Sequence, residues 1–256
     1  MAPAPRFSAE EQERLIISSA IEAINKSSLF DFSMSAIAKL AGLSMGSVYK
    51  FVQCKEDVLI ALATRMYQQR QGVFKKVLNL PLTTPERIIA TSLLNFSKVQ
   101  MYGFDNQLES LVNCDAMKKR CSARWLAQMT TCDEKCQFMF RNFLQKAADS
   151  GELTSGERDI EEINLGAWSL AVGYFQTVHL HHYKQDNQAG NIATDSKTNT
   201  GDNIANNLEE NSFMLAPNAL HIKTMQRLVN SYDWQKKVSS DDINKVCQKL
   251  TDAALR

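Results

Sequence analysis

The residues whose types and spacing could do chemistry lie between Ser33 and Lys55. This stretch contains three lysines and no acidic residue, whereas residues 1–60 as a whole carry six basic and seven acidic residues. A lysine ammonium can neutralise a phosphate group, and even a modest local cluster is adequate for phosphate contact. The side chains from Ser44 to Lys50 are mostly small or slender, which would permit close approach to base edges. The segment therefore favours a nucleic-acid contact, although the formal net charge of the chain is only +1.

Two short helical stretches, 33–40 and 44–51, must position these side chains. The tripeptide at 41–43 separates them, and its central Gly42 can take the positive φ that a tight turn needs. Ser44 is placed to cap the second helix. Two short helices joined by such a turn are typical of a helix-turn-helix, whose second helix presents its N-terminal residues to the major groove. The early, exposed turns of that helix would carry Met45, Gly46, Ser47, Tyr49 and Lys50.

The segment resembles the DNA-binding domain of the TetR family of transcriptional regulators. The family pattern runs approximately Thr-x-x-x-Ile-Ala-x-x-Ala-Gly-Val-Ser-x-Gly-x-x-Tyr-x-x-Phe-x-x-Lys-Glu-x-Leu. The positions that correspond here are Ser33, Ile37, Ala38, Ala41, Gly42, Leu43, Ser44, Gly46, Tyr49, Val52, Lys55, Glu56 and Val58. The resemblance covers roughly residues 8–65, about a quarter of the chain. Val52 stands where the family has an aromatic residue, and we expect Phe51 beside it to fill the same space.

The resemblance implies contacts to the DNA backbone. Ser33 would hydrogen-bond a phosphate at the start of its helix, and Tyr49 and Lys50 would contact further phosphates. Lys55, which opens the fourth helix, would hold another phosphate beside the positive end of that helix. Contacts of this kind set the register of a protein on DNA but carry no sequence information.

The resemblance also implies which residues read the sequence. Met45 and Ser47 would face the bases, and Ser44 and Gly46 complete the predicted DNA-binding set. Two alternatives stay open: the segment could be a helical hairpin that only packs, and Tyr49 could be a partly buried packing aromatic.

The rest of the chain shows helical periodicity and little punctuation, with 10 glycines and 5 prolines. We predict an all-α fold with a DNA-binding domain at 1–54, its helix-turn-helix at 33–52, and a helical effector-binding and dimerisation domain at 55–256. Residues 185–212 contain seven asparagines and no aromatic residue, which predicts a flexible loop. The helices are expected at 8–25, 33–40, 44–51, 55–80, from 84 through Phe96, 105–116, 118–148, 157–184, 219–234 and 240–254.

The helices between 55 and 148 carry stripes of methionines and aromatic residues. Such stripes are most often part of a hydrophobic core. In TetR-like proteins, however, the same core is hollowed into an effector pocket. The residues expected to line it are Met66, Phe96, Trp125, Met129 and Phe140. Cys132 and Cys136 lie four residues apart and could bind metal or sense oxidation, yet they continue an apolar stripe and are read as small hydrophobic residues. We expect no cofactor and no metal.

The helix at 157–184 is apolar on two sides, which predicts that it is packed from both sides. One face is left for a second copy of the chain, because regulators of this kind pair two helix-turn-helix motifs. The residues expected at the dimer interface are Ala167, Trp168, Ala171, Tyr174, Phe175 and Val178. The helices at 219–234 and 240–254 would contribute second. The alternative is that these later helices cover the other face within one subunit.

Several classes of function are disfavoured. The chain has no nucleophile elbow, phosphate loop or dinucleotide fingerprint, so we do not expect an enzyme. It has no run of 18 apolar residues, no signal-peptide pattern at its start and no Cys-x-x-Cys among its six cysteines, so we expect a cytoplasmic protein with reduced thiols and no membrane partner. The sequence predicts a homodimeric transcriptional regulator of operator DNA, a repressor released by a small lipophilic effector. The alternative is an all-helical interaction protein of the same fold without such an effector.

Overall fold

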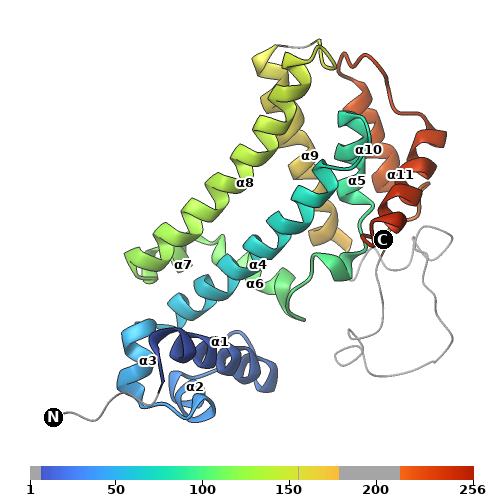
Figure 1. Cartoon of the computed structure of the whole chain (residues 1–256). Coiled ribbons are helices and arrows are strands. Elements are labelled where there is room, and N and C mark those ends of the chain that lie inside the picture. The colour runs from blue at the N-terminus through green and yellow to red at the C-terminus, as the bar shows by residue number, and fades with distance from the viewer. Residues whose placement is uncertain (1–6, 155, 179–213) are drawn as a thin grey trace, which may run out of the picture. The chain divides into compact units, whose positions relative to one another are not determined.

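The computed structural model describes residues 7–154, 156–178 and 214–256, and their regular structure is helical (Figure 1). The helices are α1 (Ala9–Lys26), α2 (Met34–Ala41), α3 (Met45–Phe51), α4 (Lys55–Leu78), α5 (Thr84–Ser92), the short 3-10 helix η1 (Phe96–Lys98), α6 (Asp105–Val112), α7 (Asp115–Arg120), α8 (Ala123–Asp149), α9 (Glu157–Val178), α10 (Leu220–Asn230) and α11 (Ser240–Asp252). Within the described residues, extended pairing is represented by one isolated antiparallel bridge between Leu153 and Trp234. The all-α prediction is confirmed.

Several predicted helix boundaries differ from the structure. The helix expected at 105–116 ends at Val112, and the helix expected at 219–234 ends at Asn230. The helix that begins at Thr84 ends at Ser92, short of Phe96, because the side chain of Asn95 caps a new turn by accepting from Ser97 N at 3.0 Å. The predicted helix 118–148 is broken into α7 and α8. Its break lies at Ser122, whose backbone N–H donates to a side chain of α4 instead of to its own helix.

The chain divides into two compact units, and α4 and α8 contribute residues to both. Unit 1 comprises Met1–Gln68 and Tyr102–Glu134, and unit 2 comprises Gln69–Met101 and Lys135–Arg256. Each unit has its own hydrophobic core. The functional boundary expected after residue 54 stays a prediction, because these units are defined by contacts and not by function.

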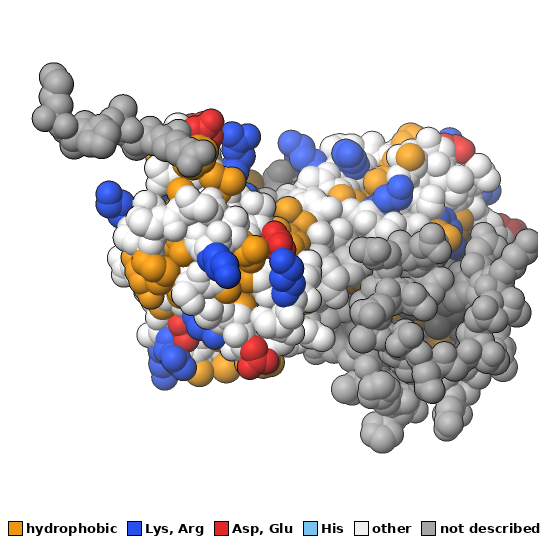
Figure 2. All heavy atoms as spheres, turned by 90° about the horizontal axis from the view of Figure 1, so that it is seen from below, with side chains coloured by type: hydrophobic (Ala, Val, Ile, Leu, Met, Phe, Trp, Pro, Cys, Tyr) orange, Lys and Arg blue, Asp and Glu red, His pale blue; other side chains and the backbone are white. Residues whose placement is uncertain are grey.

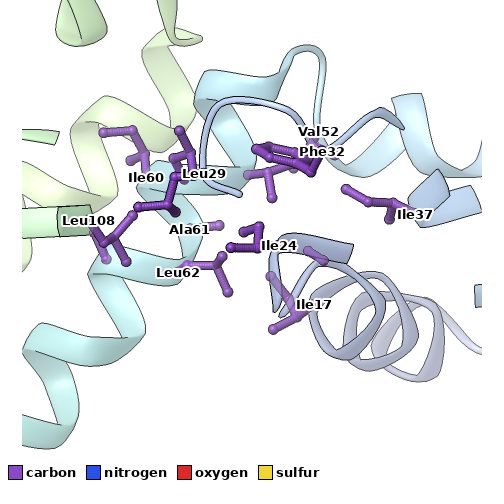
Figure 3. Close-up of a cluster of buried hydrophobic side chains, with 14 of the residues drawn as sticks. Ile17, Ile24, Leu29, Phe32, Ile37, Val52, Ile60, Ala61, Leu62 and Leu108 are labelled. Carbon is purple, nitrogen blue, oxygen red and sulfur yellow. The ribbon is translucent and has the colours of Figure 1, made fainter. Parts of the chain in front are cut away.

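Unit 1 is built around α1, α2, α3 and the first turns of α4. A capping box starts α1, where Ser8 Oγ accepts from Glu11 N at 3.2 Å and the Glu11 carboxylate accepts from Ser8 N at 2.7 Å. Figure 3 shows apolar side chains of α1, α2, α4 and α6, of the α1–α2 loop and of Val52 just after α3 pointing toward one another. Those labelled are Ile17, Ile24, Leu29, Phe32, Ile37, Val52, Ile60, Ala61, Leu62 and Leu108. Each such branched or aromatic side chain stabilises the unit by about 1.5–3 kcal/mol when fully buried.

Unit 2 is built from α5, α9, α10 and α11. Helix α10 packs against both α5 and α9, and α11 packs against α5. Gly166 allows a close approach of α9 to α10, because a Cβ there would lie 3.2 Å from Leu228 Cδ2. The C-terminal Arg256 guanidinium joins two segments by donating to the carbonyls of Leu93 and Leu215, at 2.9 and 2.8 Å.

The predicted loop at 185–212 lies outside the described residues. Among the helices that the structure describes, none combines the length and the apolar character needed to cross a bilayer.

Candidate nucleic-acid interface

The helix-turn-helix expected at 33–52 is present as α2, a tight turn and α3. Gly42 ends α2 in the left-handed region, with φ of 64° and ψ of 30°, a conformation that costs glycine little. Leu43 N donates to the carbonyl of Ala38 at 3.0 Å and closes the turn. A side chain with a Cβ would be strained in this conformation, so Gly42 favours a reversal of the chain at this point.

Serine caps both helices of the motif. Ser33 Oγ accepts from Ala36 N at 3.1 Å at the start of α2, and Ser44 Oγ accepts from Ser47 N at 3.1 Å at the start of α3. Each hydroxyl also contacts a second serine hydroxyl at 3.0 Å, Ser35 in the first case and Ser47 in the second. These two predicted site residues therefore fix the helix ends, and their exposed hydroxyls lie at the positive ends of both helices.

Helix α3 is anchored on one side and exposed on the other. Val48 is fully buried in the core of unit 1. Met45 and Tyr49 are 37% and 46% exposed, and Lys50 is exposed as well. Tyr49 is thus not a core aromatic. Figure 2, which views the protein from below, shows exposed hydrophobic side chains on this unit interspersed with basic and acidic side chains.

Gly46 has no packing reason to be a glycine. A Cβ built at Gly46 would meet one atom within 4 Å, Ser44 Oγ at 3.8 Å, which is an ordinary van der Waals distance. Its φ is not in the left-handed region, in contrast to Gly42. A glycine in a helix costs up to about 1 kcal/mol relative to alanine. The packing of this chain alone therefore does not require a glycine at this position.

Lys55 opens α4 and is held at the surface of unit 1 by the α1–α2 loop. Its Nζ donates to the Phe30 carbonyl at 2.8 Å and lies 4.8 Å from the centroid of the Phe32 ring. An ammonium has three donors, so this bond does not exhaust its capacity. The neighbouring Phe30 side chain is 72% exposed. The position fits the predicted phosphate contact beside the N-terminus of α4, which stays a prediction.

The predicted pocket residues do not form one cluster. Met66, Trp125 and Met129 are buried in the core of unit 1. Phe96 packs against the core of unit 2, and Phe140 contacts Phe74 in unit 2, with ring centroids 5.6 Å apart. The apolar residues recur without a break along α4 and α8 in the sequence, but each of these helices contributes residues to both units.

The predicted dimer residues of α9 lie on two different sides. Ala167 and Tyr174 pack against the core of their own subunit, and the Tyr174 ring stacks on His221 at 4.2 Å between centroids. Ala171 is partly buried, whereas Trp168 is 46% exposed. The predicted contacts of Phe175 and Val178 concern side chains outside the described part of the chain.

Leu165 was missing from the predicted dimer set, and it is 68% exposed on α9. It shares the exposed side of the helix with Trp168, three residues later. The signal was in the sequence, because Leu165 and Trp168 follow helical spacing on the face opposite to Ile160 and Ile163, both of which are buried.

Comparison with known proteins gives two results. No protein-family model and no curated protein matches the chain. Similar solved structures include FadR from Bacillus subtilis in complex with stearoyl-CoA, at 19% identity over 64% of this chain and 86% of that chain, with a TM-score of 0.44. A regulatory protein of the tetR family from Rhodococcus RHA1 matches at 19% identity over 68% and 87%, with a TM-score of 0.47. The reduced form of NemR from E. coli matches at 14% identity over 65% and 88%, with a TM-score of 0.45.

The chain is similar to TetR-family regulators, both at its helix-turn-helix sequence and among the solved structures that it matches.

Proposed function

We propose that the protein is a transcriptional regulator that reads operator DNA with α3. The observation that carries the proposal is the exposed face of α3, which offers Met45, Gly46, Tyr49 and Lys50 and no acidic residue, on a helix anchored by buried Val48. A recognition helix needs this division, because one side must hold the helix and the other must enter the major groove.

Gly46 supports close approach to DNA. The space around its Cα is open in the protein, and glycine has no side chain. A DNA backbone or a base edge can therefore approach α3 more closely at this position than it could if another residue stood there. Lys50 on the same helix supplies a charge for a phosphate, and the N-terminal ends of α2 and α4 add positive dipole ends at Ser33 and Lys55. Together they would position the motif on the duplex by phosphate contacts and leave the base edges to Met45 and Ser47.

The test starts from DNA selection, because the operator is unidentified. Purified protein is used to select duplexes from a library with 30 random base pairs, and binding to the selected duplex is compared with binding to a random duplex by fluorescence anisotropy. Specific binding typically exceeds non-specific binding by about 10³-fold or more. Enrichment of one sequence with such a ratio supports the proposal. Equal binding to all duplexes would contradict it and favour the alternative of an interaction protein.

The proposed input is a small lipophilic effector that releases a repressor from its operator. Release requires that the effector binds the DNA-free state more tightly than the DNA-bound state. Stearoyl-CoA, which occupies the B. subtilis FadR structure, is a suitable first probe. The proposal is supported if operator affinity falls as the fraction of protein that has bound the probe rises. An operator affinity that is independent of a bound probe would contradict it.

The proposed functional state is a homodimer through the exposed side of α9. Leu165 and Trp168, three residues apart, are 68% and 46% exposed, and large apolar side chains in one patch mark an interaction site. A two-fold axis beside α9 would bury the pair of one subunit against that of the other. Helices α10 and α11 are the proposed second contributors to the dimer interface. Leu220, at the start of α10, is 66% exposed.

A further inference from the structure

The C-terminal end of α3 is attached to the start of α8 within unit 1. The indole N–H of Trp125 donates to the carbonyl of Phe51, the last residue of α3, at 3.2 Å. The two rings meet edge to face, with centroids 5.1 Å apart and planes at 73°. Trp125 is 5% exposed, so the loss of this partly buried hydrogen bond would leave the donor of a buried side chain without its partner. The ring of Phe51 thus packs against Trp125, and the side chain of Val52, which stands at the position of the family's aromatic residue, is buried as well.

A buried carboxylate makes a second attachment at the same place. Asp57 is fully buried in the first turn of α4. Its Oδ2 accepts from Gln53 N at 2.8 Å, just after α3, and its Oδ1 accepts from Ser122 N at 2.7 Å, just before α8. Each oxygen therefore holds a different segment of the backbone. One side chain joins the end of α3 to the α7–α8 loop, and charge-assisted bonds of this kind are about twice as strong as neutral ones.

Two further contacts accompany these bonds at the protein surface. Cys54 Sγ lies 3.5 Å from the carbonyl of Arg120, and the Arg120 guanidinium pairs with Glu56 at 2.9 Å. Arg120 is 73% exposed, so its ion pair contributes little. Burial raises the pKa of the Cys54 thiol to about 11, which keeps it protonated and unreactive at neutral pH. The attachment therefore depends on Asp57 and Trp125.

We propose that Asp57 and Trp125 are positioning residues that fix the orientation of α3 for reading bases, an inference that rests on the function proposed above. Helix α3 has seven residues, which is too short to be stable or to hold a direction without tertiary contacts. Ser44 and Val48 fix its beginning and middle, and Asp57 and Trp125 fix its end. Base readout needs precise geometry, whereas phosphate contact tolerates small rotations of the helix.

Asp57→Asn separates positioning from packing because it leaves the volume of the side chain unchanged. An asparagine has one acceptor oxygen, and its NH2 group would face the second backbone N–H as another donor. Either Gln53 N or Ser122 N then loses its partner, so the link between α3 and α8 opens. The matched control is Asp105→Asn. Asp105 is 1% exposed, lies in unit 1 and accepts from Tyr102 N at 2.8 Å, so it is also a buried capping carboxylate, but Tyr102 belongs to neither α3 nor α8.

The experiment measures affinity for the selected duplex and for a random duplex, well below the unfolding temperature of each variant. Asp57→Asn is expected to lower the ratio of the two affinities at least tenfold, with unchanged binding to random DNA. Asp105→Asn is expected to keep the wild-type ratio. Trp125→Phe, which keeps an aromatic ring but removes the donor to Phe51, is expected to lower the ratio in the same direction and serves if Asp57→Asn does not fold.

An unchanged ratio in a folded Asp57→Asn or Trp125→Phe variant would overturn the inference, and so would an equal loss in Asp105→Asn. These outcomes differ from a failure of the proposed function, in which the wild-type protein itself selects no sequence. A purely structural role would lower the unfolding temperature of all three variants but would not change the ratio of specific to random binding.

Discussion

Replacing Gly46 by alanine should make the protein more stable and make it bind DNA less well. The added Cβ meets only Ser44 Oγ, at 3.8 Å, so no clash opposes the gain in helix propensity. The gain is below about 1 kcal/mol, because Gly46 lies in the first turn of α3. For a chain of this size that corresponds to a rise in Tm of at most about 2–4 °C. The same Cβ would occupy the space through which DNA is proposed to approach.

Gly72→Ala is the matched control for this prediction. Gly72 is exposed on α4, in unit 2, and an added Cβ there meets nothing within 4 Å. Both variants should therefore unfold at higher temperature in a calorimetric scan. Only Gly46→Ala should lose affinity for the selected duplex in an anisotropy titration, by about tenfold or more if the methyl group holds the bases away. Wild-type operator affinity in a stabilised Gly46→Ala variant would refute the close approach of DNA to α3.

Three further outcomes are expected. Lys50→Ala should weaken binding to all duplexes and reduce the slope of log K against log salt by about 1, whereas the exposed Lys146→Ala on α8 should leave the slope unchanged. Equal slopes in both variants would contradict a phosphate contact at Lys50. Trp168→Glu or Ala171→Asp should give monomers in sedimentation at micromolar concentration and weaken operator binding, and an intact dimer in both would exclude this face of α9. Burial lowers the pKa of His221 to about 4, so the unfolded chain binds a proton at this residue before the folded protein does as the pH falls. About 3 kcal/mol of the free energy of unfolding should therefore be lost between pH 6.5 and 4. Urea titrations of His221→Leu should lack this loss, and a pH dependence identical to that of the wild-type protein would contradict it.

The positions of the helices followed from local chemistry in the sequence. Ser44 was predicted to cap the second helix of the motif, and it does so in the structure. Ser8 and Ser33 cap α1 and α2 in the same way. Gly42 indicated the turn, because the left-handed conformation that ends α2 costs glycine little. These signals depend on residues a few positions apart, and such signals can be read without knowing the tertiary structure.

The tertiary features could not be read in this way. The stripe through Trp125 and Phe140 was continuous in the sequence, yet its two ends belong to different cores. Asp57 looked like an ordinary acid in the first turn of a helix, but it accepts from Ser122, 65 residues later in the chain. Because a hydrogen bond over such a separation leaves no periodic trace, neither the break between α7 and α8 nor the attachment of α3 was foreseen.

The central claim is that α3 reads bases, and comparing the sequences selected by variants tests it most directly. Wild-type protein, Met45→Ala and Ser47→Ala are each used to select duplexes from the same random library. The account predicts that the wild-type protein enriches a two-fold symmetric sequence and that each variant changes the preferred base at equivalent positions of both half-sites. Identical selected sequences for all three proteins, or no enrichment by the wild-type protein, would contradict it.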